Sequence, residues 1–256
     1  MIQNKGDNRQ IPAIIELSQV DSTNNYALGQ IREGLAYHGL AIFAHEQLAG
    51  KGQRGKKWVT EPGQNIHLSL IIEPKPLVLS DLFALSALVA VKTREFLHEK
   101  APGNWWIKWP NDLYFQDRKA GGILIENILS GQNWKWAVIG IGLNINQAHF
   151  SGDLNKAVSL HQITDLSYNC VELAAGLAES ILHGLAKPDA GCDQYAADNL
   201  EQYNRFLFRK GEVVKFADGD MVFEAKVLGV TRDGKLQLEG APAPFYEHGA
   251  LSWLVP

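Results

Sequence analysis

The segment 50–57 gathers residues that are suited to binding a small anion. It reads Gly-Lys-Gly-Gln-Arg-Gly-Lys-Lys, so that three glycines are interleaved with four cations. Glycine lets backbone N–H groups approach a ligand closely, and lysine and arginine donate charge-assisted hydrogen bonds to phosphate or carboxylate oxygens. Taken alone, such a segment is more often a solvated basic turn. Its composition nevertheless suits a loop that wraps around a phosphate or carboxylate group.

Two well-known phosphate-binding motifs fit part of this segment, and the residues after it exclude both. Gly50, Gly52 and Gly55 have the spacing of the dinucleotide fingerprint, and residues 50–56 fit the first seven positions of a P-loop. Both motifs need a helix directly after the glycines. The Pro-Gly pair at 62–63 stops a helix within a turn or two. We therefore expect an anion-binding loop between two strands.

Three charged residues lie in and after the tryptophan-rich segment 105–115. Lys108 stands between large apolar residues, where a lysine is rare unless an anion partners it. Asp112 follows, and Lys119 comes shortly before the glycine pair 121–122. Two glycines inside a strand indicate a bulge or the close approach of a ligand. The tryptophans themselves are more often core residues than ligand contacts.

The polar segment 21–25, Asp-Ser-Thr-Asn-Asn, has two interpretations. Such side chains cap helix N-termini because they accept hydrogen bonds from free backbone N–H groups. Capping is the commoner role and is favoured for this segment taken alone. A helix N-terminus with several small polar groups is also suited to binding a polar ligand.

The elements that must position these residues indicate an α+β fold. Short apolar runs predict strands, helical periodicity predicts helices, and hairpins favour a mixed, mainly antiparallel sheet flanked by helices. A turn at 116–118 should join two strands of one hairpin, and the last 50 or so residues predict a small all-β barrel. The expected strands are 11–17, 39–45, 65–73, 105–115 with a break at 110–112, 119–126 and 134–142, then 213–217, 221–230 and 235–239; the expected helices follow residue 25 and span 80–100, 171–187 and 192–206.

Composition limits the class of protein. A chain of 256 residues suits one large domain with a small appendage, and a net charge of −4 gives no reason to expect nucleic acid as the main partner. Cys170 and Cys192 are too few for a disulfide framework, and no Cys/His cluster has zinc spacing, so we expect no metal-binding residues. The polar residues 1–10 do not resemble a signal peptide, and segment 81–97 is too short and charged to span a membrane. We expect a cytoplasmic protein.

Four segments together resemble the biotin protein ligases, which attach biotin to a lysine of a carboxylase carrier domain. They are 21–25, 47–55, 108–112 with 119–122, and 140–146, where the sequence reads Gly-Ile-Gly-Leu-Asn-Ile-Asn. Their order and spacing fit the family across the catalytic domain, and the C-terminal segment is similar to its SH3-like barrel. The resemblance implies a catalytic domain of the class II aminoacyl-tRNA synthetase-like type over residues 1–207, followed by the barrel over residues 208–256.

The resemblance also implies a reaction in two steps. Biotin and ATP, accompanied by Mg²⁺, form biotinyl-5′-AMP and pyrophosphate, and a lysine of a biotin carboxyl carrier protein then displaces AMP. Because carboxylate and triphosphate repel one another, the cations of this sequence are suited to bringing them together. A homodimer is compatible with the resemblance. Since about ten residues precede the first expected strand, we expect no DNA-binding domain and no DNA partner.

By resemblance, single residues receive roles. The expected catalytic residues are Lys119, Asp112, Arg54 and Lys108. The expected biotin-binding residues are Ser22, Thr23, Asn24, Gln47, Gly50, Lys51, Gly52, Gln53, Lys119, Gly121 and Gly122. The expected ATP-binding residues are Lys51, Arg54, Lys56, Trp58, Lys108, Asn111 and Asn144. The tryptophan-rich strand should line the tunnel for the acyl chain, and segment 159–161 should lie toward adenine. Lys51 and Gln53 depart from the arginines that the family often carries at those positions.

Two other functions remain open at this point. A lipoate or octanoate protein ligase shares the fold and a similar chemistry, although the glycine-basic loop with Gln47 before it favours biotin. A non-catalytic biotin or nucleotide sensor belongs to a different class, and it would need neither Lys119 nor Asp112 beside a phosphate-wrapping loop.

Overall fold

The computed structural model describes residues 13–131, 133–150, 156–186 and 192–254. Within these ranges one sheet has seven strands in the order β1-β2-β3-β7-β6-β5-β4; β1 and β2 run parallel, and the other neighbouring pairs are antiparallel. The predicted mixed, mainly antiparallel sheet is thus confirmed. The strands are β1 (Ile14–Val20), β2 (Leu40–Gln47), β3 (Asn65–Ile72), β4 (Trp105–Lys108), β5 (Asp112–Phe115), β6 (Arg118–Ser130) and β7 (Asn133–Asn144).

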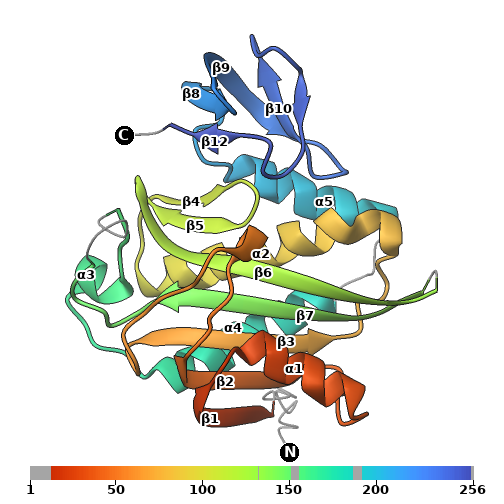
Figure 1. Ribbon diagram of the computed structural model, residues 1–256, viewed down its shortest axis with the longest axis vertical. Coiled ribbons are helices and arrows are strands. Elements are labelled where there is room, and N and C mark those ends of the chain that lie inside the picture. The colour runs from red at the N-terminus through yellow and green to blue at the C-terminus, as the bar shows by residue number, and fades with distance from the viewer. Residues whose placement is uncertain (1–12, 132, 151–155, 187–191, 255–256) are drawn as a thin grey trace, which may run out of the picture.

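Helices cover both faces of this sheet (Figure 1). Successive side chains of a strand point to opposite faces, so in β2 Ile42 packs with Ala27 of α1 while Phe43 joins the core beneath α2 and α4. β3 is buried along its whole length, and the polar residues Asn65, His67 and Ser69, which share one of its faces, are buried too. The helices are α1 (Thr23–Arg32), α2 (Leu82–Lys100), α3 (Leu160–Thr164), α4 (Cys170–Leu185) and α5 (Cys192–Arg205), with short 3-10 turns η1 (Gln53–Gly55) and η2 (Leu79–Asp81).

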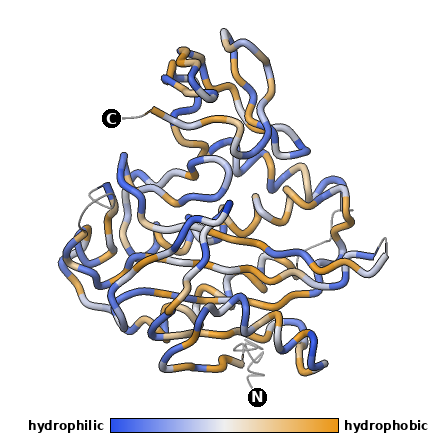
Figure 2. Tube along the Cα trace, viewed as in Figure 1, coloured by the Kyte–Doolittle hydropathy of each residue, from blue (hydrophilic) through white to orange (hydrophobic). Residues whose placement is uncertain are grey.

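The C-terminal residues form a second, five-stranded antiparallel sheet within the described ranges, in the order β11-β10-β9-β8-β12. Its buried residues, such as Phe216 and Val227, belong to the same hydrophobic cluster as the main sheet. In Figure 2 the central strands are mainly orange, and many connecting loops are blue. Because buried residues of both sheets form one hydrophobic cluster, the two sheets pack as one body. The strands are β8 (Val213–Asp218), β9 (Met221–Val230), β10 (Leu236–Glu239), β11 (Phe245–Tyr246) and β12 (Ser252–Trp253).

Several element boundaries differ from the sequence-based predictions. The first strand begins at Ile14, and residues 11 and 12 lie outside the described ranges. The tryptophan-rich segment forms two antiparallel strands instead of one interrupted strand, with Lys108 opposite Asp112. This pairing places two candidate residues side by side because the turn at 109–111 reverses the chain between them. The predicted hairpin turn at 116–118 is confirmed by the antiparallel pairing of β5 with β6.

The predicted domain boundary at residue 207 stays a prediction. Leu207 forms a bridge with Ile107 of β4, so the connecting segment is itself joined to the main sheet. Among the described helices, none is long and apolar enough to cross a membrane.

Candidate active site

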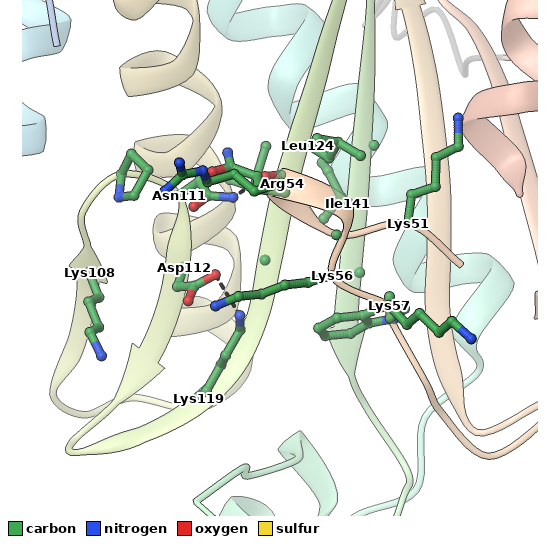
Figure 3. A pocket seen from close by; sticks show the side chains of 18 of the residues that line it. Lys51, Arg54, Lys56, Lys57, Lys108, Asn111, Asp112, Lys119, Leu124 and Ile141 are labelled. Carbon is green, nitrogen blue, oxygen red and sulfur yellow. Dashed lines mark hydrogen bonds and ion pairs between the residues drawn. The ribbon is translucent and has the colours of Figure 1, made fainter. Parts of the chain in front are cut away.

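A cavity of about 1120 Å³ lies between the main sheet, the basic loop and the C-terminal sheet. We call the basic loop, residues 50–59, the lid. Helix α1 supplies one end of the cavity, and the β4–β5 turn with the start of β6 supplies the other (Figure 3). The lining includes most of the predicted site residues, namely Ser22, Thr23, Asn24, Gln47, Lys51, Gly52, Gln53, Arg54, Lys56, Trp58, Lys108, Asn111, Asp112, Lys119, Gly122 and Asn144.

One end of the cavity is a cluster of neutral hydrogen-bonding groups. Ser22 is the N-cap residue of α1, but its side chain makes no capping hydrogen bond. The backbone N–H and hydroxyl of Thr23 donate to Gln47 Oε1 at 2.8 and 3.1 Å. Because both donations go to the oxygen of Gln47, its Nε2 remains a donor toward a ligand. Capping alone therefore does not explain the polar segment 21–25.

The floor of the cavity consists of glycines on adjacent strands. Gly140 and Gly142 lie two residues apart on β7 and so share a face, and Gly122 of β6 pairs with Gly142. A Cβ on Gly142 would lie 2.5 Å from Cε2 of Trp58, whose ring covers this strand. The absence of side chains therefore lets the lid tryptophan rest directly on the sheet.

The second predicted glycine of the pair 121–122 has a different neighbourhood. A Cβ on Gly121 would meet the side chain of Leu143 and the carbonyl of Gly142, and Gly121 is not among the lining residues. Its lack of a side chain is explained by strand packing. A Cβ on Gly122, in contrast, would lie 3.2 Å from Asp112 Oδ1, at the centre of the site.

The other end of the cavity holds an ion pair. Lys119 Nζ lies 2.6 Å from Asp112 Oδ1, and the two side chains are 35% and 27% exposed. The Lys119 backbone is held on both sides, since its N–H donates to Lys156 O and its carbonyl accepts from Val158, each at 2.8 Å. Figure 3 shows Lys56 of the lid directed toward the same pair. The ammonium group of Lys119 is thus held at the cavity, where an anion could reach it.

The charged side chains that line the cavity are mostly positive. Among the described lining residues there are six lysines and arginines, and Asp112 is the single carboxylate. Fixed cations in a partly enclosed site stabilise a bound phosphate or carboxylate far more than they would in water. The cations are Lys51, Arg54, Lys56, Lys57, Lys108 and Lys119.

The lid has the predicted position between two strands, and its own backbone closes it. Gly52 donates to the Lys56 carbonyl at 2.6 Å, and Trp58 donates to the Gly50 carbonyl at 2.9 Å. Gly50 is not a lining residue; a Cβ there would lie 2.5 Å from the Trp58 carbonyl. Arg54 adopts a left-handed conformation, with φ of 55°. The glycines therefore permit the tight backbone of the lid.

Residues 16–144 match the family described as the biotin/lipoate A/B protein ligase family. Over 233 residues the chain is 39% identical to the bifunctional ligase/repressor BirA of Escherichia coli strain K12, a match covering 89% of this chain and 69% of BirA. The chain belongs to this ligase family. It is also 35% identical over 139 residues to biotin–[acetyl-CoA-carboxylase] ligase of Paracoccus denitrificans, covering 53% of this chain and 56% of that one. In structure it is similar to biotin protein ligase from Aquifex aeolicus in complex with biotin and ATP, with a TM-score of 0.75, 26% identity, and coverage of 94% and 97% of the two chains.

In this member of the ligase family, the C-terminal sheet supplies one wall of the cavity. The Arg54 guanidinium donates to the carbonyl of Gly249, so the lid is attached to the C-terminal segment. His248 lines the cavity and meets Trp109 edge-on, with ring centroids 6.0 Å apart. Burial, and then the charge of Arg54, lower the pKa of His248. Sequence analysis missed this wall because nothing in the pattern of a small barrel says which loop faces the main domain.

Lys108 has aromatic partners in place of the expected anion. Its Nζ lies 4.9 Å from the centroid of Tyr114, 5.8 Å from Trp253 and 6.0 Å from Phe208, and it donates to the Tyr114 hydroxyl at 3.2 Å. Figure 3 shows its side chain extending away from Asp112 and Lys119. Burial lowers the pKa of Lys108 to about 8. The residue therefore joins the β4–β5 hairpin to the C-terminal sheet through cation–π contacts.

Replacing Lys108 by methionine should stabilise the protein at neutral pH. The pKa of Lys108 is 10.5 in the unfolded chain and about 8 in the fold, so the unfolded state binds this proton more tightly than the folded state does. Below pH 8 this difference lowers the free energy of unfolding by about 3 kcal/mol. The cost fades as pH rises from 8 to 10.5. Urea unfolding should therefore show that Lys108→Met has a higher free energy of unfolding than the wild type at pH 7, and that this difference is smaller at pH 10. A gain that is equal at both pH values, or matched by exposed Lys135→Met, would contradict this.

The remaining predicted residues have structural partners as well as a place in the cavity. Asn111 donates to the Ile123 carbonyl and ties the β4–β5 turn to β6. Asn144 donates to the carbonyls of Lys119 and Val158 at 3.3 and 3.2 Å, which supports the lysine backbone. Their roles toward ATP stay predictions.

Part of the tryptophan-rich segment lines the cavity, since Trp109 is among its lining residues. Trp105 does not line the cavity; it is 1% exposed in the core, and its Nε1 donates to the Ala101 carbonyl at 2.7 Å. Of segment 159–161, no residue is in the described lining, and Ser159 caps α3 instead. A strand rich in tryptophan could not reveal which rings faced the ligand, since both faces of β4 are covered.

Gly142→Ala should weaken ligand binding by displacing Trp58. The new methyl group would overlap the indole ring and push Trp58 away from the floor. Loss of about 2 kcal/mol of apolar contact between this ring and the ligand corresponds to roughly a thirtyfold rise in the ligand concentration needed for half-saturation. Titration with biotin followed by tryptophan fluorescence or calorimetry measures this. Gly29→Ala in α1 is the control, because nothing lies within 4 Å of its Cβ position. Unchanged binding by Gly142→Ala would show that Trp58 does not cover the ligand.

Proposed function

We propose that this chain is an ATP-dependent biotin protein ligase, which activates biotin as biotinyl-5′-AMP and transfers it to a lysine of a biotin carboxyl carrier protein. The observation that carries the proposal is the division of one cavity into two chemically different ends. Neutral amides and hydroxyls from α1 and β2 gather at one end, and Lys56 of the lid points toward the Lys119–Asp112 pair at the other. A molecule with a neutral polar head and a distal carboxylate fits this arrangement.

The names of two relatives support biotin and ATP as the substrates. The Aquifex aeolicus structure holds biotin and ATP, and the relative from Paracoccus denitrificans is a biotin–[acetyl-CoA-carboxylase] ligase. The second name favours a carboxylase carrier as the acceptor of biotin. The identity of the carrier in this case stays a proposal.

Binding should orient biotin along the glycine floor. The ureido carbonyl can accept from Gln47 Nε2, and Thr23 and Asn24 lie beside it at the neutral end. The acyl chain would follow the glycine floor from the neutral end toward Lys119, and Trp58, whose ring rests on Gly142, would have to lift to cover it. The carboxylate then reaches Lys119, which can release Asp112 in exchange for it.

In the first step a biotin carboxylate oxygen attacks the α-phosphorus of ATP, and the bond from that phosphorus to pyrophosphate breaks. Both reactants are anionic, so the cations of the lid and Lys119 offset their repulsion and the charge that develops on the phosphate. Mg²⁺ would arrive with the triphosphate as part of the substrate. The described residues suit that role for the metal, because they contain no cluster of three or more acidic, cysteine or histidine side chains, and Asp112 is already paired with Lys119.

In the second step the neutral amine of the carrier lysine attacks the acyl carbon, and AMP leaves with the electrons of the broken anhydride bond. The amine must lose one proton as the amide forms. Asp112 is the candidate to accept or orient that proton, because its carboxylate lies at the same end of the cavity as Lys119. Closure of the lid should keep water from the anhydride meanwhile.

A single assay separates this function from its rivals. Purified protein is incubated with ATP, Mg²⁺ and a biotin carrier domain, and biotin or lipoate transfer to the carrier is measured at equal concentrations. We expect biotin transfer with release of AMP and pyrophosphate. Preferential transfer of lipoate would instead identify a lipoate ligase, although the neutral polar end suits the ureido group that lipoate lacks. Biotin binding without pyrophosphate release would identify a sensor.

A further inference from the structure

Glu126 of β6 lies behind the neutral end of the cavity and has no part in the chemistry above. Its Oε2 accepts a hydrogen bond from Asn24 Nδ2 at 2.7 Å, and its Oε1 lies 3.9 Å from Lys51 Nζ. Its side chain is 31% exposed. One carboxylate thus contacts a buried residue of the cavity wall and a cation of the lid.

The contacts of Asn24 determine which of its amide atoms faces a ligand. Nδ2 points at β6, where the Leu124 carbonyl at 3.4 Å and Glu126 accept its hydrogens. Oδ1 accepts from Ser69 Oγ at 2.6 Å. Since both hydrogens are engaged, the group that Asn24 can offer to the cavity is the remaining lone pair of Oδ1. A charged acceptor makes the stronger hydrogen bond, so Glu126 holds this orientation against a flip of the amide.

The second contact concerns the lid. Lys51 Nζ donates to Asn25 Oδ1 at 2.5 Å, in the first turn of α1, with Glu126 beside it. Figure 3 shows Lys51 directed away from the Asp112–Lys119 pair, in contrast to Lys56. In this chain the lysine ties the lid to α1 and β6 and does not reach toward the reactive end.

We propose that Glu126 is a positioning residue for ligand binding. It orients Asn24 as a hydrogen-bond acceptor for a ureido N–H of biotin, and it anchors the closed lid through Lys51. This inference rests on the proposed function, because it takes biotin as the substrate. It adds a source of specificity: a head group that lacks an N–H donor at this place leaves the Asn24 oxygen unpaired.

The test compares two substitutions in a steady-state assay of biotin-dependent pyrophosphate release. Glu126→Leu removes both contacts and should raise KM for biotin about tenfold, as expected for loss of a hydrogen bond to a charged group. KM for ATP and kcat should stay within twofold. Glu126→Gln keeps an acceptor for Asn24 and removes the charge beside Lys51, so its KM for biotin should rise about threefold. Discrimination against biotin methylated on a ureido nitrogen should fall several-fold in Glu126→Leu.

A double-variant cycle tests the lid contact. If Lys51 and Glu126 act through each other, Lys51→Met combined with Glu126→Gln should raise KM for biotin no more than the larger single change. The matched control is Glu224→Gln, because Glu224 pairs with Lys215 at 3.7 Å on the outer surface of the C-terminal sheet. This control should leave both KM values unchanged.

The outcomes separate the inference from the proposed function. Wild-type protein without biotin-dependent pyrophosphate release would overturn the proposed function. With an active wild type, a KM for biotin that stays within twofold in Glu126→Leu would overturn the inference alone. Parallel rises in both KM values with a lowered melting temperature would overturn it too, since a merely structural role predicts them. If Glu126→Leu does not fold, Glu126→Gln and the cycle with Lys51→Met decide in its place.

Discussion

Replacing Lys119 by alanine should lower the rate of adenylate formation about a hundredfold. The ammonium group lies at the cationic end of the cavity with its backbone held by Lys156 and Val158, so it is positioned before substrates arrive. Removing one preorganised stabiliser of developing negative charge typically costs about 3 kcal/mol of transition-state stabilisation. The measurement is the exchange of labelled pyrophosphate into ATP in the presence of biotin, which reports the first step alone.

Two further substitutions serve as comparisons for Lys119→Ala. Lys135→Ala removes the same charge from an exposed position on β7 and should leave the exchange rate unchanged. Lys119→Arg keeps the charge but alters its geometry, and should retain part of the activity. Exchange by Lys119→Ala at a near wild-type rate would remove this lysine from the mechanism.

Asp112→Asn should slow the transfer step by about a hundredfold, and more than it slows adenylate formation. A general base typically contributes at least this factor, and asparagine keeps the size of the side chain but cannot accept the proton. Single-turnover transfer from preformed biotinyl-5′-AMP to a carrier domain isolates the second step. The first step should change less, because the cations of the lid and Lys119 remain.

The control for this substitution is Asp117→Asn, a similar change on the β5–β6 turn. Asp117 is 60% exposed and pairs with Arg209 at 2.5 Å, outside the cavity lining. It should leave transfer at the wild-type rate. Transfer from preformed adenylate at the wild-type rate by Asp112→Asn would assign the carboxylate to holding Lys119 instead of to proton transfer.

The sequence alone determined the local features of this protein. Glycines and cations between two apolar runs predicted the lid, and the Pro-Gly pair at 62–63 excluded the helix that other phosphate-binding loops need. Alternation and hairpin turns predicted a mainly antiparallel sheet with flanking helices. These features depend on residues close together in the chain, where backbone preferences and hydrophobic periodicity act. The four family segments then indicated the reaction, which the relatives support.

Tertiary structure decided which faces and partners the side chains have. Nothing local distinguishes the aromatic cage around Lys108 from an anion site, because Trp253 and Phe208 come from the far end of the chain. The Arg54 contact with Gly249 likewise joins residues 195 positions apart. The Trp105 side chain lies in the core, whereas the Trp58 side chain of the lid packs on Gly142.

One signal for the glycine floor was present in the sequence. Glycines two apart in a strand share a face, so Gly140 and Gly142 indicated a close approach there, but not by which group. The approaching groups are Trp58 and Asn24: a Cβ at Gly140 would lie no more than 3.0 Å from the amide atoms of Asn24. Such pairings depend on the relative placement of elements that are distant in sequence. That placement is set by the packing of the whole core, and no short segment carries it.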